Sequence, residues 1–170
     1  MIQRWNKQIS GHHARMDVTF LTFIGKKGGK IRRFQYAAID DAPRVRALKI
    51  CQKHTQANGQ DFVDHIIDKF PFRIREIRTD NGRKFQAKFH WHVDDIGIRH
   101  AYIKRGTSKL NGKVERSHRS DGQEFYQLLS YKGDVDLGAK LNQRENFYNF
   151  HKPHGAFKGN APREALRERL

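Results

Sequence analysis

The sequence has little of what disulfide, zinc and membrane proteins require. Its single cysteine, Cys51, excludes an internal disulfide framework and any cysteine-rich zinc module. Cys51 lies in an apolar run, which predicts an inert thiol in the core. No apolar run approaches the roughly 20 residues that a membrane-spanning helix needs, and no signal peptide is visible. We therefore expect a soluble, cytoplasmic protein with no membrane partner.

Histidine does not replace the missing cysteines as a source of zinc ligands. The ten histidines are scattered along the chain. The closest ones in sequence lack enough further ligands nearby for a zinc site. These groups are His12 with His13, His90 with His92, and His151 with His154.

Acidic residues are also scarce: the chain has 34 Lys and Arg but only 18 Asp and Glu, which gives a formal net charge of +16. The basic residues are dispersed, which favours a broad nucleic-acid surface over a targeting signal. Ribosomal and membrane-surface proteins share such a balance, so charge alone selects no function. Although the mean hydropathy is −0.88, 12 Phe, 5 Tyr and 2 Trp supply bulk for the core of one domain.

Hydrophobic periodicity predicts alternating strands and helices, hence a layered α/β fold. Period-two alternation predicts five strands, over residues 14–23, 34–39, 45–51, 72–80 and 96–102. Spacing of about four residues predicts helices over 60–70 and 83–95, one around Glu115, and a final helix through Leu137, Leu141 and Tyr148.

Asp80 ends the fourth predicted strand and precedes Asn81 and Gly82. One interpretation is turn chemistry, in which Asp80 caps the next helix and Gly82 takes a positive φ. The other is functional, because a carboxylate at the end of a strand in so basic a chain suits a metal-dependent enzyme acting on a polyanion. The residues alone leave both interpretations open.

Asp17 is the second acidic candidate. Aspartate is depleted in strands, so its place in the first alternating run needs a reason, and a solvent-facing position or an ion pair with Arg15 would supply one. The adjacent Asp40 and Asp41 are rivals, although a carboxylate pair before Pro43 is also common turn composition.

Three motifs in the middle of the chain resemble the catalytic core of retroviral-type integrases and bacterial insertion-sequence transposases. They are Thr-Asp-Asn-Gly ending at Gly82 with Phe85 after it, Gly97-Ile98 with His100, and Asn-Gly-Lys-Val-Glu-Arg ending at Arg116. The last string is the most specific. The end of the chain, from Tyr148 to Pro162, resembles the transposases' closing YN…RPH…A…G…P signature, with Lys152 in place of the usual Arg.

This resemblance implies a ribonuclease-H-like fold, a five-stranded mixed sheet flanked by helices. The core would occupy residues 12–165, after an extended lead-in (1–11) and before a short C-terminal tail (166–170). It also implies an Asp-Asp-Glu triad of Asp17, Asp80 and Glu115. Asp17-Val-Thr19 matches the family's Asp-x-Thr context, and 34 residues separate Asp80 from Glu115, close to the family's usual gap. Asp40 and Asp41 would then be structural.

The triad would bind two divalent ions, Mg²⁺ or Mn²⁺, since three carboxylates and DNA phosphate oxygens are the hard ligands that these ions prefer. Asp17 would bridge both ions, while Asp80 and Glu115 would each hold one. DNA-binding residues follow from the same motif, with Asn111 at the DNA end and basic side chains near phosphates. Those basic residues are Lys109, which replaces the family's Pro-Gln together with Ser108, and Lys113, Arg116 and Arg119.

The implied activity is DNA strand cleavage and strand transfer during integration or transposition, on double-stranded element ends and target DNA. The resemblance also implies a homo-oligomer on DNA, in the cytoplasm and associated with the nucleoid. Relatives carry a helix-turn-helix region ahead of the core, whereas about a dozen residues precede the first predicted strand here. A separate recognition subunit would replace that region; alternatively, the chain is a truncated, catalytically idle DNA-binding remnant. A basic RNA-binding protein is a third hypothesis, which leaves the motif spacing unexplained.

Overall fold

The computed structural model describes residues 9–24, 27–80, 82–103 and 134–168. Within these ranges the strands form one five-stranded sheet in the order β3-β2-β1-β4-β5. The first three strands are antiparallel neighbours, and β4 and β5 run parallel to β1. The predicted five-stranded mixed sheet is therefore confirmed. The strands are β1 (Ala14–Ile24), β2 (Lys30–Asp40), β3 (Arg46–Cys51), β4 (Glu76–Thr79) and β5 (Arg99–Tyr102).

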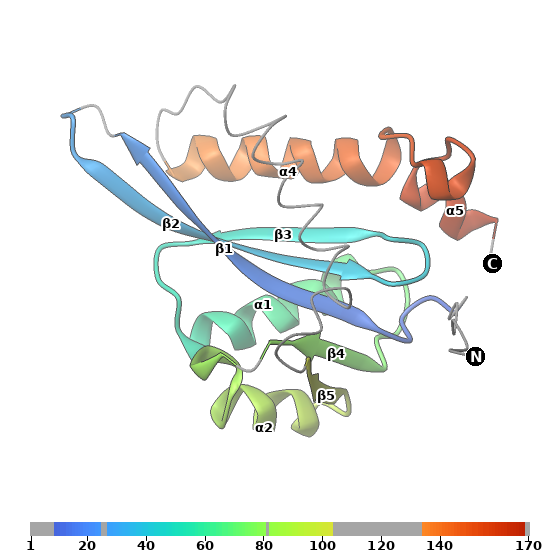
Figure 1. Ribbon diagram of the computed structural model, residues 1–170, viewed down its shortest axis with the longest axis horizontal. Helices are drawn as coiled ribbons and strands as arrows, with labels where there is room; N and C mark the ends of the chain where they lie inside the picture. Colours follow the sequence, from blue (N-terminus) through green and yellow to red (C-terminus); the bar gives the residue numbers. More distant parts are fainter. Residues whose placement is uncertain (1–8, 25–26, 81, 104–133, 169–170) are drawn as a thin grey trace.

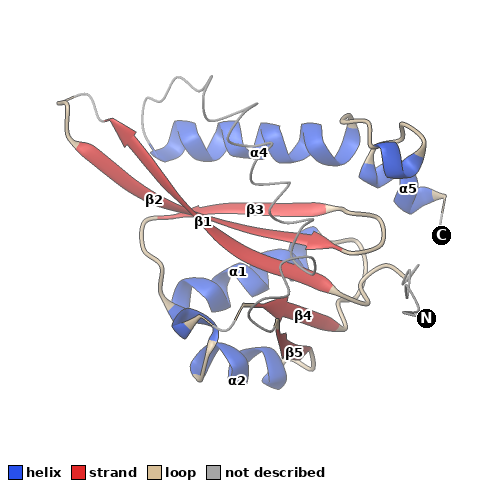
Figure 2. Cartoon of the chain, in the orientation of Figure 1, coloured by secondary structure: helices blue, strands red, loops and turns tan. Residues whose placement is uncertain are grey.

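Helices cover both faces of this sheet (Figures 1 and 2). α1 (Gln56–Lys69) and α2 (Lys88–Asp95) lie on one face, and α4 (Asp134–Phe150) lies on the other. The main core sits beneath α1 and α2, where apolar side chains of the sheet and helices are removed from water. Its fully buried members include Met16, Tyr36, Phe62, Ile66 and Phe89. A smaller cluster under α4 contains Ala37, Leu48 and Leu141.

α1 begins four residues before the predicted start at residue 60. Thr55 is its N-cap, and the Thr55 hydroxyl accepts a hydrogen bond of 3.1 Å from the amide of Asn58. The apolar spacing starts only at Phe62, so the polar first turn carried no periodic signal. Gly59 in that turn faces Phe89, and a Cβ there would lie 3.0 Å from the ring. This close approach lets α2 pack against α1.

The predicted helix over 83–95 is two elements. A 3₁₀ turn, η1 (Arg83–Phe85), precedes α2, and Ala87 between them has a φ of +42°. Phe85 and Phe89 are both buried despite this break, which explains how their four-residue spacing imitated a continuous helix. The strands β4 and β5 are also shorter than predicted, with 4 residues each.

α4 protects the outer edge of the sheet, where an unpaired strand would otherwise expose its backbone. The Asn149 side chain accepts from the Arg46 amide at 2.8 Å and donates to its carbonyl at 2.7 Å. The Glu145 carboxylate accepts from the Leu48 amide at 2.7 Å. Both side chains extend from α4 and form hydrogen bonds with the backbone of β3.

The apolar pattern predicted that the helix through Leu137, Leu141 and Tyr148 is the final one, which is wrong. α5 (Pro162–Arg167) follows it. Leu166, within the expected C-terminal tail, is only 4% exposed and belongs to the main core. Within the described ranges, no helix combines the length and apolar character needed to cross a membrane.

Candidate active site at one edge of the sheet

The predicted carboxylates lie at one edge of the sheet because of the way its strands run. β4 and β5 are parallel to β1, and β3 is also parallel to it through two successive antiparallel pairings. The carboxyl ends of β3, β4 and β5 therefore point to the same edge. Asp80 comes directly after β4, and β1 passes this edge on its way into the β1–β2 hairpin.

Asp17 and Asp80 lie just beyond the paired part of two neighbouring strands. Ala14 pairs with Ile77 and Arg15 with Arg78 in the parallel register of β1 and β4. Continued for two more residues, this register would bring Asp17 level with Asp80, which comes directly after β4. Side chains alternate between faces along a strand, so Asp17 lies on the face of β1 opposite Ala14, which belongs to the main core.

Local hydrogen bonds orient both carboxylates. Oδ1 of Asp17 accepts from the Val18 amide at 2.8 Å, and Oδ1 of Asp80 accepts from the Gly82 amide at 2.8 Å. Asp80 therefore forms the turn that its sequence context predicted, but Gly82 has a φ of −67° and not the expected positive value. Asp17 is half-buried and Asp80 is exposed, so turn formation leaves the carboxylate of Asp80 accessible.

The third predicted carboxylate lies outside the described residues. So do all five predicted DNA-binding residues. Across the described ranges, no group of three His, Cys, Asp or Glu side chains could hold a metal ion. Of the three predicted ligands, the structure therefore describes two, Asp17 and Asp80. The predicted site residues that lie outside the described ranges are Glu115, Lys109, Asn111, Lys113, Arg116 and Arg119.

The rival carboxylates lie at the opposite edge of the sheet. Asp40 pairs in register with Ala14 at the start of β1, and its side chain is fully buried. It accepts from the Gly11 amide at 2.9 Å and from the Ala42 amide at 3.0 Å. Asp41 accepts from Nε of Arg15 at 2.8 Å. Arg15 thus pairs with Asp41 and not with Asp17.

A buried histidine supports the backbone of Asp80. The Thr79 hydroxyl donates to the Asp80 carbonyl at 2.9 Å, so its oxygen accepts from Nε2 of His100 at 2.8 Å. Nδ1 of His100 lies 3.0 Å from Nδ1 of His90, on α2. Burial, together with the nearby His90, lowers the pKa of His100 to about 4. His100 is therefore neutral at pH 7 and available as a single donor to Thr79.

His54 is a neighbour of the site that periodicity could not reveal. It follows β3 and lies within ring-contact distance of Phe20, Phe34, Tyr36 and Phe85. Burial lowers the pKa of His54; the charge of Lys84 lowers it further and that of Asp80 raises it. The contact with Phe85, whose amide donates to the Gly82 carbonyl at 2.9 Å, places His54 near the Asp80 turn. Its partners are scattered over more than sixty positions, so no local pattern pointed to it.

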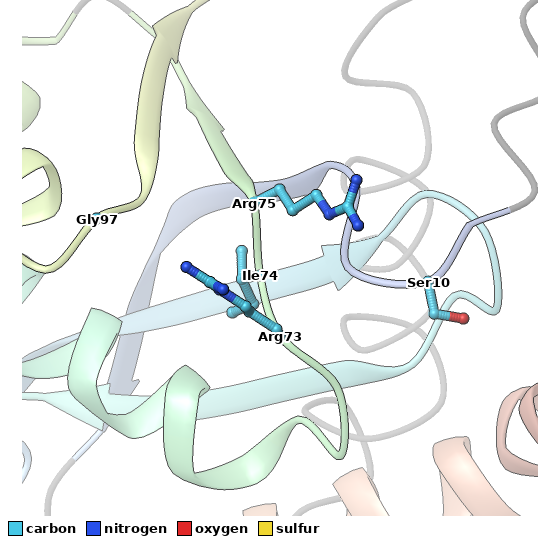
Figure 3. Close-up of a pocket in the computed structure, with 5 residues that line it drawn as sticks. All are labelled: Ser10, Arg73, Ile74, Arg75 and Gly97. Carbon is cyan, nitrogen blue, oxygen red and sulfur yellow. The ribbon is translucent and has the colours of Figure 1, made fainter.

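A cavity of about 450 Å³ lies at the other end of β4, where Gly11 contacts the chain that enters the strand (Figure 3). Gly11 has a φ of +78°, and a Cβ there would lie 1.9 Å from the Arg73 carbonyl oxygen. The cavity has no carboxylate in its lining and lies at the sheet edge opposite Asp80, so it is not the predicted metal site. Its lining residues are Ser10, Arg73, Ile74, Arg75 and Gly97.

Sequence comparisons match this chain to integrases. Residues 96–162 match the integrase core domain family. A protein of Spiroplasma virus SpV1-C74 named "Putative integrase ORF3" is 26% identical over 182 residues, which cover 92% of this chain and 50% of that protein. The chain therefore spans about half the length of this curated relative.

Solved structures with a similar fold are retroviral. The HTLV-2 integrase catalytic core domain in complex with magnesium, in its dimeric form, has a TM-score of 0.75 and 17% identity over 92% of this chain and 97% of that one. The simian T-cell lymphotropic virus intasome has a chain with a TM-score of 0.74 and 16% identity, covering 93% and 55%. The catalytic core domain of BIV integrase has a TM-score of 0.67 and 19% identity, covering 93% and 95%. At these identities the likeness shows the fold, which is ribonuclease-H-like, as the motifs implied.

Proposed function

Since this chain is related to integrase core domains, we propose that it is the catalytic core of a transposase or integrase that cuts and joins DNA strands. The observation that carries the proposal is the parallel register of β1 and β4, which, continued past Arg15 and Arg78, would bring Asp17 level with Asp80 at the carboxyl edge of the sheet. The net charge of +16 adds affinity for a polyanionic substrate.

The donor set at this edge fits a divalent cation. Asp17, which is half-buried, and Asp80, which is exposed, offer hard carboxylate oxygens at this edge of the sheet. Together with Glu115 they would hold two Mg²⁺ or Mn²⁺ ions, Asp17 contacting both and the other two carboxylates one each. Such ions, when bound, activate the attacking oxygen and stabilise the leaving oxygen of a phosphodiester. The HTLV-2 core is in complex with magnesium, which supports this choice of metal.

The protein's own groups would keep these ligands in place. The Thr79 hydroxyl binds the Asp80 carbonyl, and His100 holds that hydroxyl from β5. The Gly82 amide binds the Asp80 carboxylate. Ligands whose orientation is fixed before substrate binds lose less entropy when the reaction occurs.

We assign the DNA contacts to the strongly basic motif around Glu115. Lys109, Lys113, Arg116 and Arg119 would contact phosphates and Asn111 the DNA end. The substrates would be double-stranded element ends and target DNA. Dimeric and trimeric forms of the HTLV-2 core support a homo-oligomer on DNA. Since the chain spans about half of its curated relative, recognition of element ends would involve further sequence or a separate helix-turn-helix subunit.

The test is nicking of supercoiled plasmid by the purified chain with Mg²⁺, Mn²⁺ or a chelator. We expect nicking with either metal and none with the chelator. Asp80→Asn and Glu115→Gln should each lower the rate at least about a thousandfold, since a lost metal ligand removes several kcal/mol of transition-state stabilisation. Both should leave DNA affinity unchanged or slightly higher, because each removes one negative charge.

The same experiment distinguishes the proposed enzyme from the alternative, a DNA-binding remnant without activity. A folded chain that binds DNA but cleaves it with neither metal is a DNA-binding remnant and not an enzyme. Residual nicking near the wild-type rate in either variant would remove that residue from the site.

A further inference from the structure

The hairpin of β1 and β2 extends beyond the rest of the sheet. In the described ladder, β3 pairs with β2 only from Phe34 to Ile39, and β4 pairs with β1 only at Ala14 and Arg15. Leu21–Ile24 and Lys30–Arg33 therefore form a two-stranded ribbon, and we call this ribbon, with the Phe20–Phe34 pair at its base, the arm. Figure 1 shows the hairpin projecting past the end of β3. Such ribbons are marginally stable alone.

One face of the arm combines an exposed aromatic ring with positive charge. Phe20 pairs in register with Phe34, and Thr22 pairs with Arg32. Residues opposite each other in an antiparallel pair share a face, and Phe20, Arg32 and Lys30 are all exposed. Phe20 is 70% exposed, more than any other large apolar side chain recorded for the described residues. A single exposed Phe is ordinary, but this one lies within a basic strip.

The ring of Phe20 is supported from behind. It meets Phe34 edge to face at a centroid distance of 5.3 Å and His54 at 6.0 Å, and Phe34 lies 5.6 Å from His54. His54 is held in turn by Tyr36 at 5.8 Å and Phe85 at 6.1 Å. Nε2 of His54 is buried and has no hydrogen-bond partner in the described part of the chain. Aromatic packing, and not hydrogen bonding by this nitrogen, therefore holds the platform of Phe20, Phe34 and His54.

This platform is close to the Asp80 turn. Its inner member, His54, contacts the ring of Phe85, whose amide donates to the Gly82 carbonyl at 2.9 Å. Its outer member, Phe20, follows Asp17 by three residues, about 10 Å along a strand, and so lies on the opposite face of β1 from Asp17. In the described ladder β4 pairs with β1 only as far as Arg15. A DNA strand that runs from Asp17 to Phe20 would therefore pass around this flank of β1.

We propose that the arm is a binding site for the unpaired bases of a DNA strand beside the reacting phosphodiester. Phe20 stacks on a base, and Arg32 and Lys30 contact phosphates. Stacking needs an exposed base face, which a paired duplex does not offer, and aromatic rings between basic side chains are the general means of holding single strands. This role rests on the proposed function, which makes DNA the substrate. It adds a path for the DNA strand beyond Asp17 and Asp80.

The test compares variants of the full chain by fluorescence anisotropy with one labelled single strand and with its duplex. Phe20→Ala should weaken single-strand binding about 5- to 150-fold, the effect of one lost stacking contact, with less effect on the duplex and no change in salt slope. Phe20→Trp should restore binding, and its indole emission should be quenched by the oligonucleotide, whereas Phe20→Leu should not restore it. Arg32→Ala should lower the magnitude of the single-strand salt slope by about 0.7.

The matched control is Trp91→Ala, which removes another exposed aromatic side chain, from α2. It should leave both affinities unchanged. The proposal is overturned if Phe20→Ala behaves like Trp91→Ala, or if it weakens duplex and single strand equally. Plasmid nicking by the wild type is scored in parallel. If the wild type does not nick but Phe20→Ala still weakens single-strand binding, the proposed enzymatic activity is refuted and the proposed binding site on the arm stands. If the wild type nicks but Phe20→Ala has no effect on binding, the binding site is refuted and the activity stands.

Discussion

The sheet has an amino edge, where β1 and β4 begin, and a carboxyl edge, where β4 ends. Aspartate plays different parts at the two edges. At the amino edge, Asp40 is buried and accepts from two backbone amides, while Asp41 pairs with Arg15. At the carboxyl edge, Asp17 and Asp80 accept from the amides of Val18 and Gly82, one and two residues away. At the first edge the bonds from Gly11 to Asp40 and from Arg15 to Asp41 join distant parts of the chain, whereas these bonds at the second edge only orient a side chain locally.

We expect this difference to separate structural from functional carboxylates. The ion pairs of the amino edge continue through Glu76, which lies 2.5 Å from Nε of Arg78 and 3.4 Å from Nε2 of His13. Burial alone would raise the pKa of Glu76, but Arg78, His13 and Arg99 together hold it below its usual range. A carboxylate in such a network is occupied by cations of the protein itself. The carboxylate of Asp80, exposed at the other edge, is accessible to a metal ion.

The largest effect on stability should therefore come from the amino edge. Asp40→Ala leaves the amides of Gly11 and Ala42 without their acceptor in a buried place, and we expect a loss of about 3 kcal/mol in the free energy of unfolding. Asp80→Ala, at an exposed turn, should cost about 1 kcal/mol or less. Urea denaturation of both variants measures the contrast. Equal losses would erase the distinction between the two edges.

A smaller effect should appear with pH. The pKa of His100 falls from the ordinary 6.5 to about 4 because of burial. Folding thus favours its neutral form, and the stability that it contributes is fully present above pH 6.5 and is lost as the pH falls toward 4. His100→Gln removes this titration, so the variant should lose less stability than the wild type between pH 6.5 and 4.

The control for this titration is His151→Gln, because His151 is exposed at the end of α4. Its pH profile should match that of the wild type. Urea midpoints at several pH values give the comparison. If His100→Gln and the wild type lose stability in parallel, then His100 does not titrate as its burial indicates.

Much of this architecture follows from patterns in the sequence. Alternation located all five strands, and the motif around Asp80 placed a carboxylate at the end of β4. The errors arose where polar or irregular backbone decides the structure. Thr55 starts α1 by a hydrogen bond that apolar spacing cannot register, and the positive φ of Ala87 divides a run that looked continuous.

The supporting residues of the site were beyond sequence reasoning for another reason. The role of His100 depends on Thr79, which lies on the neighbouring strand, and that of His54 depends on rings from the hairpin and from η1. Such contacts form only when the sheet assembles, so no spacing within one segment encodes them. The expected proximity of Asp17 and Asp80 likewise depends on the parallel register of β1 and β4, and the assignment of Asp17, Asp80 and Glu115 as metal ligands stays a prediction.

The central claim is that the carboxyl edge performs the chemistry and the amino edge does not. Its most direct test is Mn²⁺-dependent plasmid nicking by Asp17→Asn beside Asp40→Asn, with each variant first shown to be folded by circular dichroism. We predict that Asp17→Asn loses nicking by about a thousandfold or more and that Asp40→Asn, once folded, nicks at nearly the wild-type rate. Loss of nicking in Asp40→Asn with activity retained in Asp17→Asn would contradict the account.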